Sequence, residues 1–127
     1  MKKRWMAAAL AGVMLMASGM AVSAESLTPS IGGLKFTAYS SIYANGADAG
    51  TVSDKSQLSM SVSASYSYVN IYTSSPGFSN KDANGSMSAV VSFSAPANCR
   101  SVRISASHKA STGSDKENWS GSTSAVY

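Results

Sequence analysis

Cysteine is nearly absent from this chain of 127 residues, which contains only Cys99. One thiol cannot close a disulfide within a chain, so the fold must be held by buried apolar surface and backbone hydrogen bonds. Cys99 follows Pro96-Ala97-Asn98, a sequence typical of turns, and we expect its thiol near the surface of a hairpin loop. An unpaired thiol there can join two chains. The sequence thus predicts a monomer or a weak disulfide-linked dimer.

Groups suited to catalysis and metal binding are also scarce. His108 is the only histidine, and no Gly-x-Ser-x-Gly nucleophile motif occurs. A closed zinc site takes about four ligands, more than one histidine and one cysteine supply. We therefore expect no metal site, no cofactor and no enzymatic activity. His108 lies in phase with Val102, Ile104 and Ala106, so we interpret it as a partly buried structural residue, with ligand binding as the alternative.

One segment approaches a calcium-binding pattern. Asn80, Asp82 and Asn84 alternate and precede Gly85, as in the first half of a calcium loop. The match ends there, because only one of the three is a carboxylate and Val91 stands where the loop needs glutamate. An Asn-Gly turn is the favoured interpretation.

A long apolar run occurs only near the N-terminus, between Lys2-Lys3-Arg4 and Met20. The basic start, the short apolar run and the small residues of Val22-Ser23-Ala24 predict a secretory signal peptide over residues 1–24, cleaved after Ala24. The run is short for a membrane span, which disfavours an uncleaved anchor. We expect a secreted protein with no stable membrane insertion after cleavage.

Charge is low once the signal peptide is removed. The chain has ten basic and six acidic side chains, but three basic residues precede the apolar run, which leaves seven against six. A net charge of +1 gives no reason to expect a nucleic-acid partner. Of the 103 residues from 25 to 127, 26 are serine, and most alternate with apolar residues. That alternation favours folded strands over a disordered chain.

The stretch from Leu58 to Thr73 shows this alternation most clearly. Five serines fall on one side of it, and the other side carries the residues Leu58, Met60, Val62, Ala64, Tyr66 and Tyr68. Because side chains of a strand point alternately to opposite faces, the stretch predicts a half-buried strand with a serine-coated outer face. After Tyr68 the apolar phase changes. A bend or bulge near Tyr68 and Val69 would explain the change, and a single strand buried on both sides at its end is the alternative.

Similar patterns predict strands over 34–44, 86–95, 101–111 and 119–127, with loops at 45–55, 74–85 and 112–118 and an extended leader over 25–33. The runs 86–95 and 101–111 read as a hairpin. No amphipathic helix is indicated. The fold class is therefore all-β: residues 25–127 are expected to form a single small antiparallel β-sandwich, immunoglobulin-like or jelly-roll-like, or a small barrel, with about five to seven strands.

Aromatic residues are the remaining candidates for binding. Tyr66 and Tyr68 fit core packing, whereas Tyr39 and Tyr43 share a face with Lys35 and Thr37 and are candidate binding residues. Trp119, near the C-terminus, is a further candidate.

In general character the chain resembles the small secreted bacteriocins of the lactococcin 972 type. The likeness consists of a signal peptide, a short cysteine-poor β domain rich in Ser, Tyr and Gly, and aromatic residues near the end. It implies an antagonist that acts on other bacteria. From the residues themselves, we expect a secreted, non-catalytic domain that binds a protein or glycan at a cell surface; the antagonist is the alternative, and an enzyme comes third.

Overall fold

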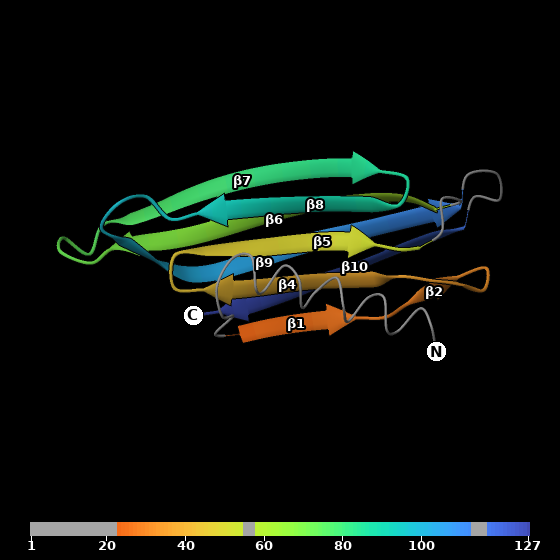
Figure 1. Ribbon diagram of the computed structural model, residues 1–127, viewed down its shortest axis with the longest axis horizontal. Helices are drawn as coiled ribbons and strands as arrows, with labels where there is room; N and C mark the ends of the chain where they lie inside the picture. The colour runs from red at the N-terminus through yellow and green to blue at the C-terminus, as the bar shows by residue number, and fades with distance from the viewer. Residues whose placement is uncertain (1–22, 55–57, 113–116) are drawn as a thin grey trace.

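The computed structural model describes residues 23–54, 58–112 and 117–127. All regular secondary structure in these ranges is β-strand, as expected (Figure 1). The described ranges contain ten strands, more than the five to seven predicted. They are β1 (Ser23–Leu27), β2 (Ser30–Ile31), β3 (Leu34–Lys35), β4 (Thr37–Tyr43), β5 (Gly46–Val52), β6 (Leu58–Asn70), β7 (Pro76–Gly85), β8 (Ser88–Ser94), β9 (Cys99–Thr112) and β10 (Asn118–Val126).

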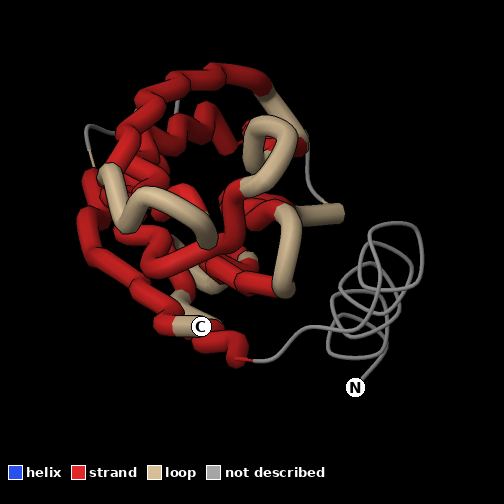
Figure 2. Tube along the Cα trace, turned by 90° about the vertical axis from the view of Figure 1, so that its left-hand side faces the viewer, coloured by secondary structure: helices blue, strands red, loops and turns tan. Residues whose placement is uncertain are grey.

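Two four-stranded antiparallel sheets make up the body of the protein. Their strand orders are β1-β4-β5-β8 and β10-β9-β6-β7, and β2 and β3 form a separate hairpin. We call the first sheet A and the second sheet B. Seen from one end, the two sheets curve around a shared interior (Figure 2). The architecture is that of a small β-sandwich whose edges approach each other, which agrees with the predicted fold class.

The core lies between the sheets and is built by alternation. In β6, every second residue from Leu58 to Tyr66 is buried, and the serines between them face outward. Alternate residues are buried in β8 and in β9 from Ile104 onward as well, whereas every residue of β4 and β5 is buried. The buried apolar cluster consists of Ile31, Phe36, Ile42, Ala47, Ala49, Leu58, Met60, Val62, Ala64, Tyr66, Ala89, Val91, Phe93, Ile104, Ala106, Ala110 and Ala125.

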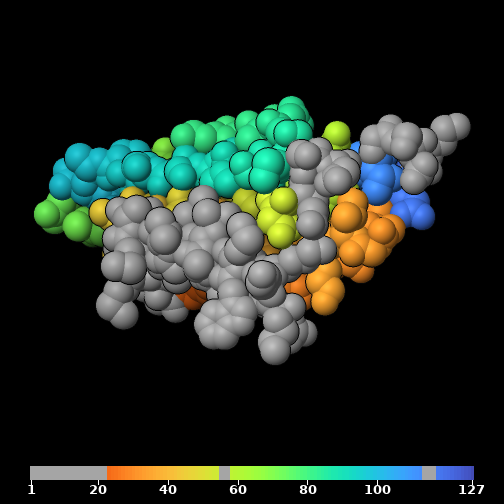
Figure 3. Space-filling view, turned by 45° about the vertical axis from the view of Figure 1, so that its right-hand side comes forward, coloured from red at the N-terminus to blue at the C-terminus, as the bar shows by residue number. Residues whose placement is uncertain are grey.

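Side chains link the two sheets along their edges. β7 and β8 lie side by side (Figure 3), and Lys81 Nζ donates a hydrogen bond to the Ser92 carbonyl oxygen at 2.6 Å. At the other edge, the Ser124 amide donates to Glu25 Oε1 at 2.8 Å, which connects β10 to β1. The edge strands of a sheet present backbone groups without a strand partner. These two contacts satisfy one such group on β8 and one on β10.

Two predicted loops are in fact strands. The segment predicted as a loop over 45–55 contains β5, a central strand of sheet A, and that over 74–85 contains β7, an edge strand of sheet B. β5 consists largely of Gly and Ala, and β7 has polar side chains and begins at Pro76. Neither carries the apolar alternation of a typical strand. Proline is tolerated at the start of an edge strand because its missing N–H faces no partner.

The predicted hairpin of 86–95 with 101–111 is wrong. β8 pairs with β5 in sheet A, whereas β9 pairs with β6 and β10 in sheet B, so the turn at 95–98 carries the chain from one sheet to the other. Two strands with aligned apolar faces can cover the same core from opposite sides. Local alternation does not distinguish this arrangement from a hairpin.

The expected bulge is present at Ser67 and Tyr68, but its extra residue lies in the partner strand. Ser67 pairs with Arg103 and Tyr68 with Ser101, which leaves Val102 without a pairing residue in β6. The bulge turns Val102 outward and Ser101 inward. Val102 was expected to share the face of Ile104; the bulge is the reason it does not.

The N-terminal part is also more ordered than the predicted leader. β1 pairs with β4, and β2 and β3 form a hairpin whose turn residues Gly32 and Gly33 have φ values of 55° and 80°. Positive φ at both central positions is the requirement of a type I′ turn. The predicted signal peptide falls mostly on residues 1–22, outside the described residues. Within the described ranges, no helix has the length and apolar character needed to cross a membrane.

Candidate binding surface

The outer face of sheet B is a dense array of serines. We call it the serine face. Each of these serines is at least partly exposed, because alternation turns its strand neighbours into the core. The serine face consists of Ser59, Ser61, Ser63, Ser65, Ser67, Ser105, Ser107, Ser111, Ser120, Ser122 and Ser124.

Strand register sets these serines in rows. Ser107 pairs with Ser63 on one side and with Ser122 on the other, and the next row is Ser65, Ser105 and Ser124. Neighbouring strands lie about 4.8 Å apart and alternate residues about 6.7 Å apart along a strand. The result is a regular grid of hydroxyl groups, each able to donate one hydrogen bond and to accept others.

β7 borders the grid with side-chain oxygens. Ser63 Oγ donates to Asp82 Oδ1 at 2.6 Å, and Ser65 Oγ donates to Asn80 Oδ1 at 2.7 Å. The Asn80–Gly85 segment is part of this strand, so it is neither a calcium loop nor the predicted Asn-Gly turn. The side-chain oxygens of Asn80, Asp82 and Asn84 lie on one face of the sheet because these residues alternate along the strand. In the described parts of the chain, no three His, Cys, Asp or Glu side chains are placed to hold a metal ion.

A groove of about 750 Å³ lies at one end of the serine face. Serines from three strands line it, together with the side chains of Asn84, Lys109 and Asn118. Lys109 supplies a cation and the two asparagines supply both donors and acceptors. Met60, Ala110 and Trp119 add apolar surface to the lining. A groove that combines polar groups with an aromatic ring suits a hydroxyl-rich ligand such as a sugar chain.

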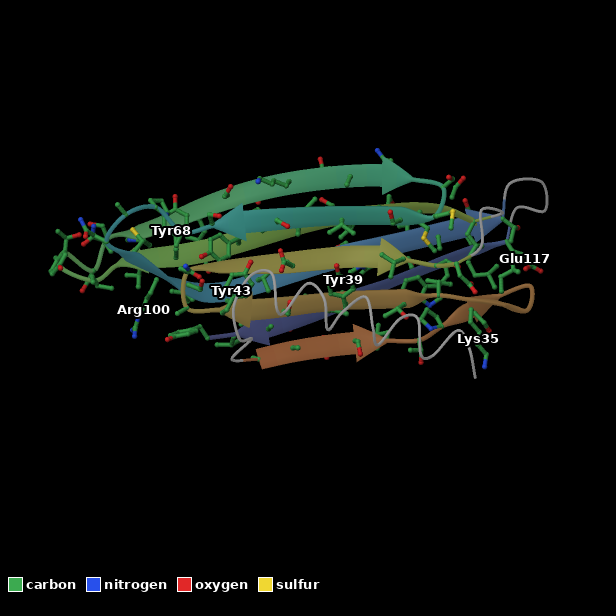
Figure 4. All side chains as sticks on the ribbon, in the orientation of Figure 1. Lys35, Tyr39, Tyr43, Tyr68, Arg100 and Glu117 are labelled. Atoms are coloured by element: carbon green, nitrogen blue, oxygen red, sulfur yellow. The ribbon has the colours of Figure 1, made fainter. Side chains whose placement is uncertain are left out.

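The tyrosines predicted for binding lie four residues apart on the outer face of β4 (Figure 4). In the 127-residue chain, Tyr39 and Tyr43 are only 5% and 7% exposed. Tyr39 pairs with Gly50 and Tyr43 with Gly46, and each ring lies so close to its glycine that a Cβ there would touch it. Tyr43 Oη donates to Asp48 Oδ2 at 3.4 Å. Burial, and secondarily the Asp48 carboxylate, raise the pKa of the Tyr39 hydroxyl well above its usual value.

His108 lies in the core, as the alternation indicated, and links the two sheets. Its Nδ1 is 2.9 Å from Thr51 Oγ1 in sheet A, and its Nε2 is 2.7 Å from Thr123 Oγ1 in sheet B. The Thr51 hydroxyl donates its one hydrogen bond to the Ser61 carbonyl oxygen at 3.0 Å, so toward the ring Thr51 Oγ1 acts as the acceptor of Nδ1–H. This assigns the neutral tautomer with the proton on Nδ1, and Thr123 donates to Nε2. Burial lowers the His108 pKa to about 4.

Trp119 and Cys99 belong to sheet B, in β10 and β9 respectively. The Trp119 ring packs edge-on against Phe36 with centroids 5.1 Å apart and covers Gly121, so it closes one end of the core. Cys99 is a half-buried free thiol at the start of β9. Of the residues predicted for binding, Tyr39 and Tyr43 share one face of β4, and Trp119 lines the groove of the serine face.

Sequence reasoning described the serine coating of β6 but did not identify the serine face as a site. The available signal was the matching serine alternation in 101–111, which has the same period. Comparison with protein-family models finds no match, and no curated protein is similar in sequence to this chain.

Proposed function

We propose that this protein is an exported, non-catalytic domain that binds a glycan of a cell surface through the serine face. The observation that supports the proposal is the grid of exposed hydroxyls beside a groove lined by Lys109, two asparagines and the Trp119 ring. Hydroxyl and amide groups fix the orientation of polar ligands through hydrogen bonds. A neutral grid matches a ligand whose own surface consists of hydroxyl groups.

The surroundings of His108 favour binding over catalysis. Its imidazole contacts two threonine hydroxyls, and it is completely buried. A catalytic base needs access to a substrate and a partner that orients it. We therefore assign His108 a structural role.

Ser107→Tyr tests the proposal directly. Ser107 is exposed at the centre of the grid, so a tyrosine there would fill the space that a ligand needs. Ser94→Tyr is the matched control, because Ser94 is also an exposed strand serine but belongs to sheet A. On glycan arrays and cell-wall preparations, we expect Ser107→Tyr to weaken binding at least tenfold and Ser94→Tyr to leave it unchanged. Equal effects of the two variants, or no glycan bound by the wild type, would contradict the proposal.

Export is the second part of the proposal. Mass spectrometry of the secreted protein should find a chain that begins at Glu25. Retention of residues 1–24 in a membrane fraction would contradict secretion.

A secreted antagonist of other bacteria is the second candidate function. It is favoured by exposed apolar side chains at one end of the sandwich, a feature typical of surfaces that bind other molecules. Growth of related strains in the presence of the purified domain distinguishes the two, since a glycan-binding domain alone should leave growth unchanged.

A further inference from the structure

Large apolar side chains are exposed mainly at one end of the sandwich. Of the eight such residues in the described part of the chain, six lie where β6 and β10 end and β7 and β9 begin. We call this group the apolar end. It consists of Ile71, Tyr72, Phe78, Val102, Val126 and Tyr127. The other two, Leu27 and Met87, lie toward the opposite end of the sheets. Such a concentration marks an interaction site more often than scattered exposed residues do.

The turn at the tip of the apolar end is held by hydrogen bonds. Asn70 Oδ1 accepts from the amides of Tyr72 and Thr73 at 2.8 and 3.0 Å, and the Ile71 amide donates to the Asn98 carbonyl oxygen at 2.9 Å. These bonds fix the backbone that carries Ile71 and Tyr72. Tyr72 is nevertheless 77% exposed, so the fold presents its side chain to the surroundings in a defined position.

Neighbouring strands extend the apolar end around this turn. Phe78 is 73% exposed and pairs with Ser67, whose other partner is Arg103. The bulge turns Val102 outward beside Arg103, and the Val102 carbonyl oxygen accepts from the Tyr127 amide at 3.0 Å. The bulge thus adds an apolar residue to a face that would otherwise carry serine.

The charges at this end are positive. Arg100 and Arg103 are both exposed, and the Arg100 guanidinium lies 6.0 Å from the centre of the Tyr127 ring. Figure 4 shows Arg100 at the end of the molecule opposite Lys35 and Glu117. The nearby described acidic residues are engaged elsewhere: Glu25 accepts from Ser124, and Asp48 is buried beside Tyr43.

We propose that the apolar end docks peripherally on anionic lipid bilayers. The turn that carries Ile71 and Tyr72 forms the extremity of the long axis, and the other members of the apolar end lie on the strand ends behind it (Figure 1). Fluid lipid can surround a projecting tip and cover the apolar side chains on all its sides. A rigid protein partner could cover them only if its surface had a matching hollow. Tyrosine is favoured at the interface of a bilayer, and arginine beside it attracts anionic headgroups. The apolar end adjoins the serine face at Ser67 and lies at the end of the sheet away from the groove.

Vesicle binding of the mature chain tests the proposal. The probes are vesicles of phosphatidylcholine alone and of phosphatidylcholine with an equal amount of phosphatidylglycerol. The wild type should bind the anionic vesicles, and binding should weaken as salt rises. Arg100→Gln with Arg103→Gln should reduce binding by about thirtyfold, since each cation near an anionic surface contributes about fivefold. Ile71→Ser with Tyr72→Ser should reduce it at least tenfold.

Two variants serve as controls. Met87→Ser removes an exposed apolar side chain at the opposite end, and Lys109→Gln removes a cation from the serine face. Both should bind vesicles like the wild type. The proposal is overturned if the wild type does not bind anionic vesicles, or if either control loses as much binding as the variants of the apolar end. Dimerisation that depends on Tyr72 in the absence of lipid would also overturn it, because the tip would then be a surface for self-association.

Discussion

Lowering the pH from 7.5 to 5 should reduce the free energy of unfolding by about 2 kcal/mol because of His108. The imidazole is buried between the sheets, and the residues around it are neutral. Val62 and Gly121 pair with it, and Thr51 and Thr123 bond its ring. A protonated ring would need an acceptor at both nitrogens. Thr51 Oγ1 already accepts from Nδ1–H, but Thr123 donates to Nε2 and would have to turn its hydroxyl proton away from the ring.

The sign and the pH window follow from the two pKa values. In the unfolded chain the His108 pKa is about 6.5, and in the folded protein burial lowers it to about 4. Protons therefore bind the unfolded chain first. The stabilisation is complete above pH 6.5 and is lost progressively as the pH falls toward 4. The full loss is at most about 3 kcal/mol, and about 2 kcal/mol of it occurs above pH 5.

Urea unfolding of residues 25–127 at a series of pH values measures this slope. The window between pH 6.5 and 5 is informative because the sequence contains one histidine and carboxylates titrate mainly below it. His108→Gln should be less stable at pH 7.5, yet its stability should hardly change down to pH 5. A wild-type slope equal to that of His108→Gln would refute the reasoning, as would a folded-state His108 pKa near 6.5 measured by NMR.

Three further predictions concern packing and the thiol. Ile104→Ala should cost about 2–5 kcal/mol of stability because Ile104 is buried at the centre of β9. Ser105→Thr on the outer face should leave the melting curve unchanged. If both variants melt at similar temperatures, the assignment of inward and outward faces in β9 is wrong. Gly50→Ala should cost about 1–3 kcal/mol in the same assay, because its Cβ would lie 2.9 Å from the Tyr39 ring and 3.0 Å from Val90, and a neutral result would show that the ring can move aside. Oxidised wild type should show a dimer band on non-reducing gels that Cys99→Ser lacks, and a monomer band alone would exclude the disulfide-linked dimer.

The sequence by itself determined the faces of the strands that alternate. In β6, serine alternates with apolar residues, so the buried face follows from the two-residue period of a strand. The same argument placed His108 in the core, because it shares the phase of Ile104. It also yielded the all-β class and a change of phase near Tyr68. These are local properties, and each can be read from neighbouring residues.

Only the tertiary structure decided which strands pair and which polar or small segments become strands. β5 is a strand because its glycines lie beneath Tyr39 and Tyr43 and its alanines fit the core, and β7 is one because its side chains meet the serines of β6. The inward turn of Ser101 depends on a bulge against β6. The binding surfaces have the same origin, since the serine face and the apolar end each combine residues from several strands. Pairing joins residues far apart in the chain, and the periodicity of a single segment contains no information about its partner.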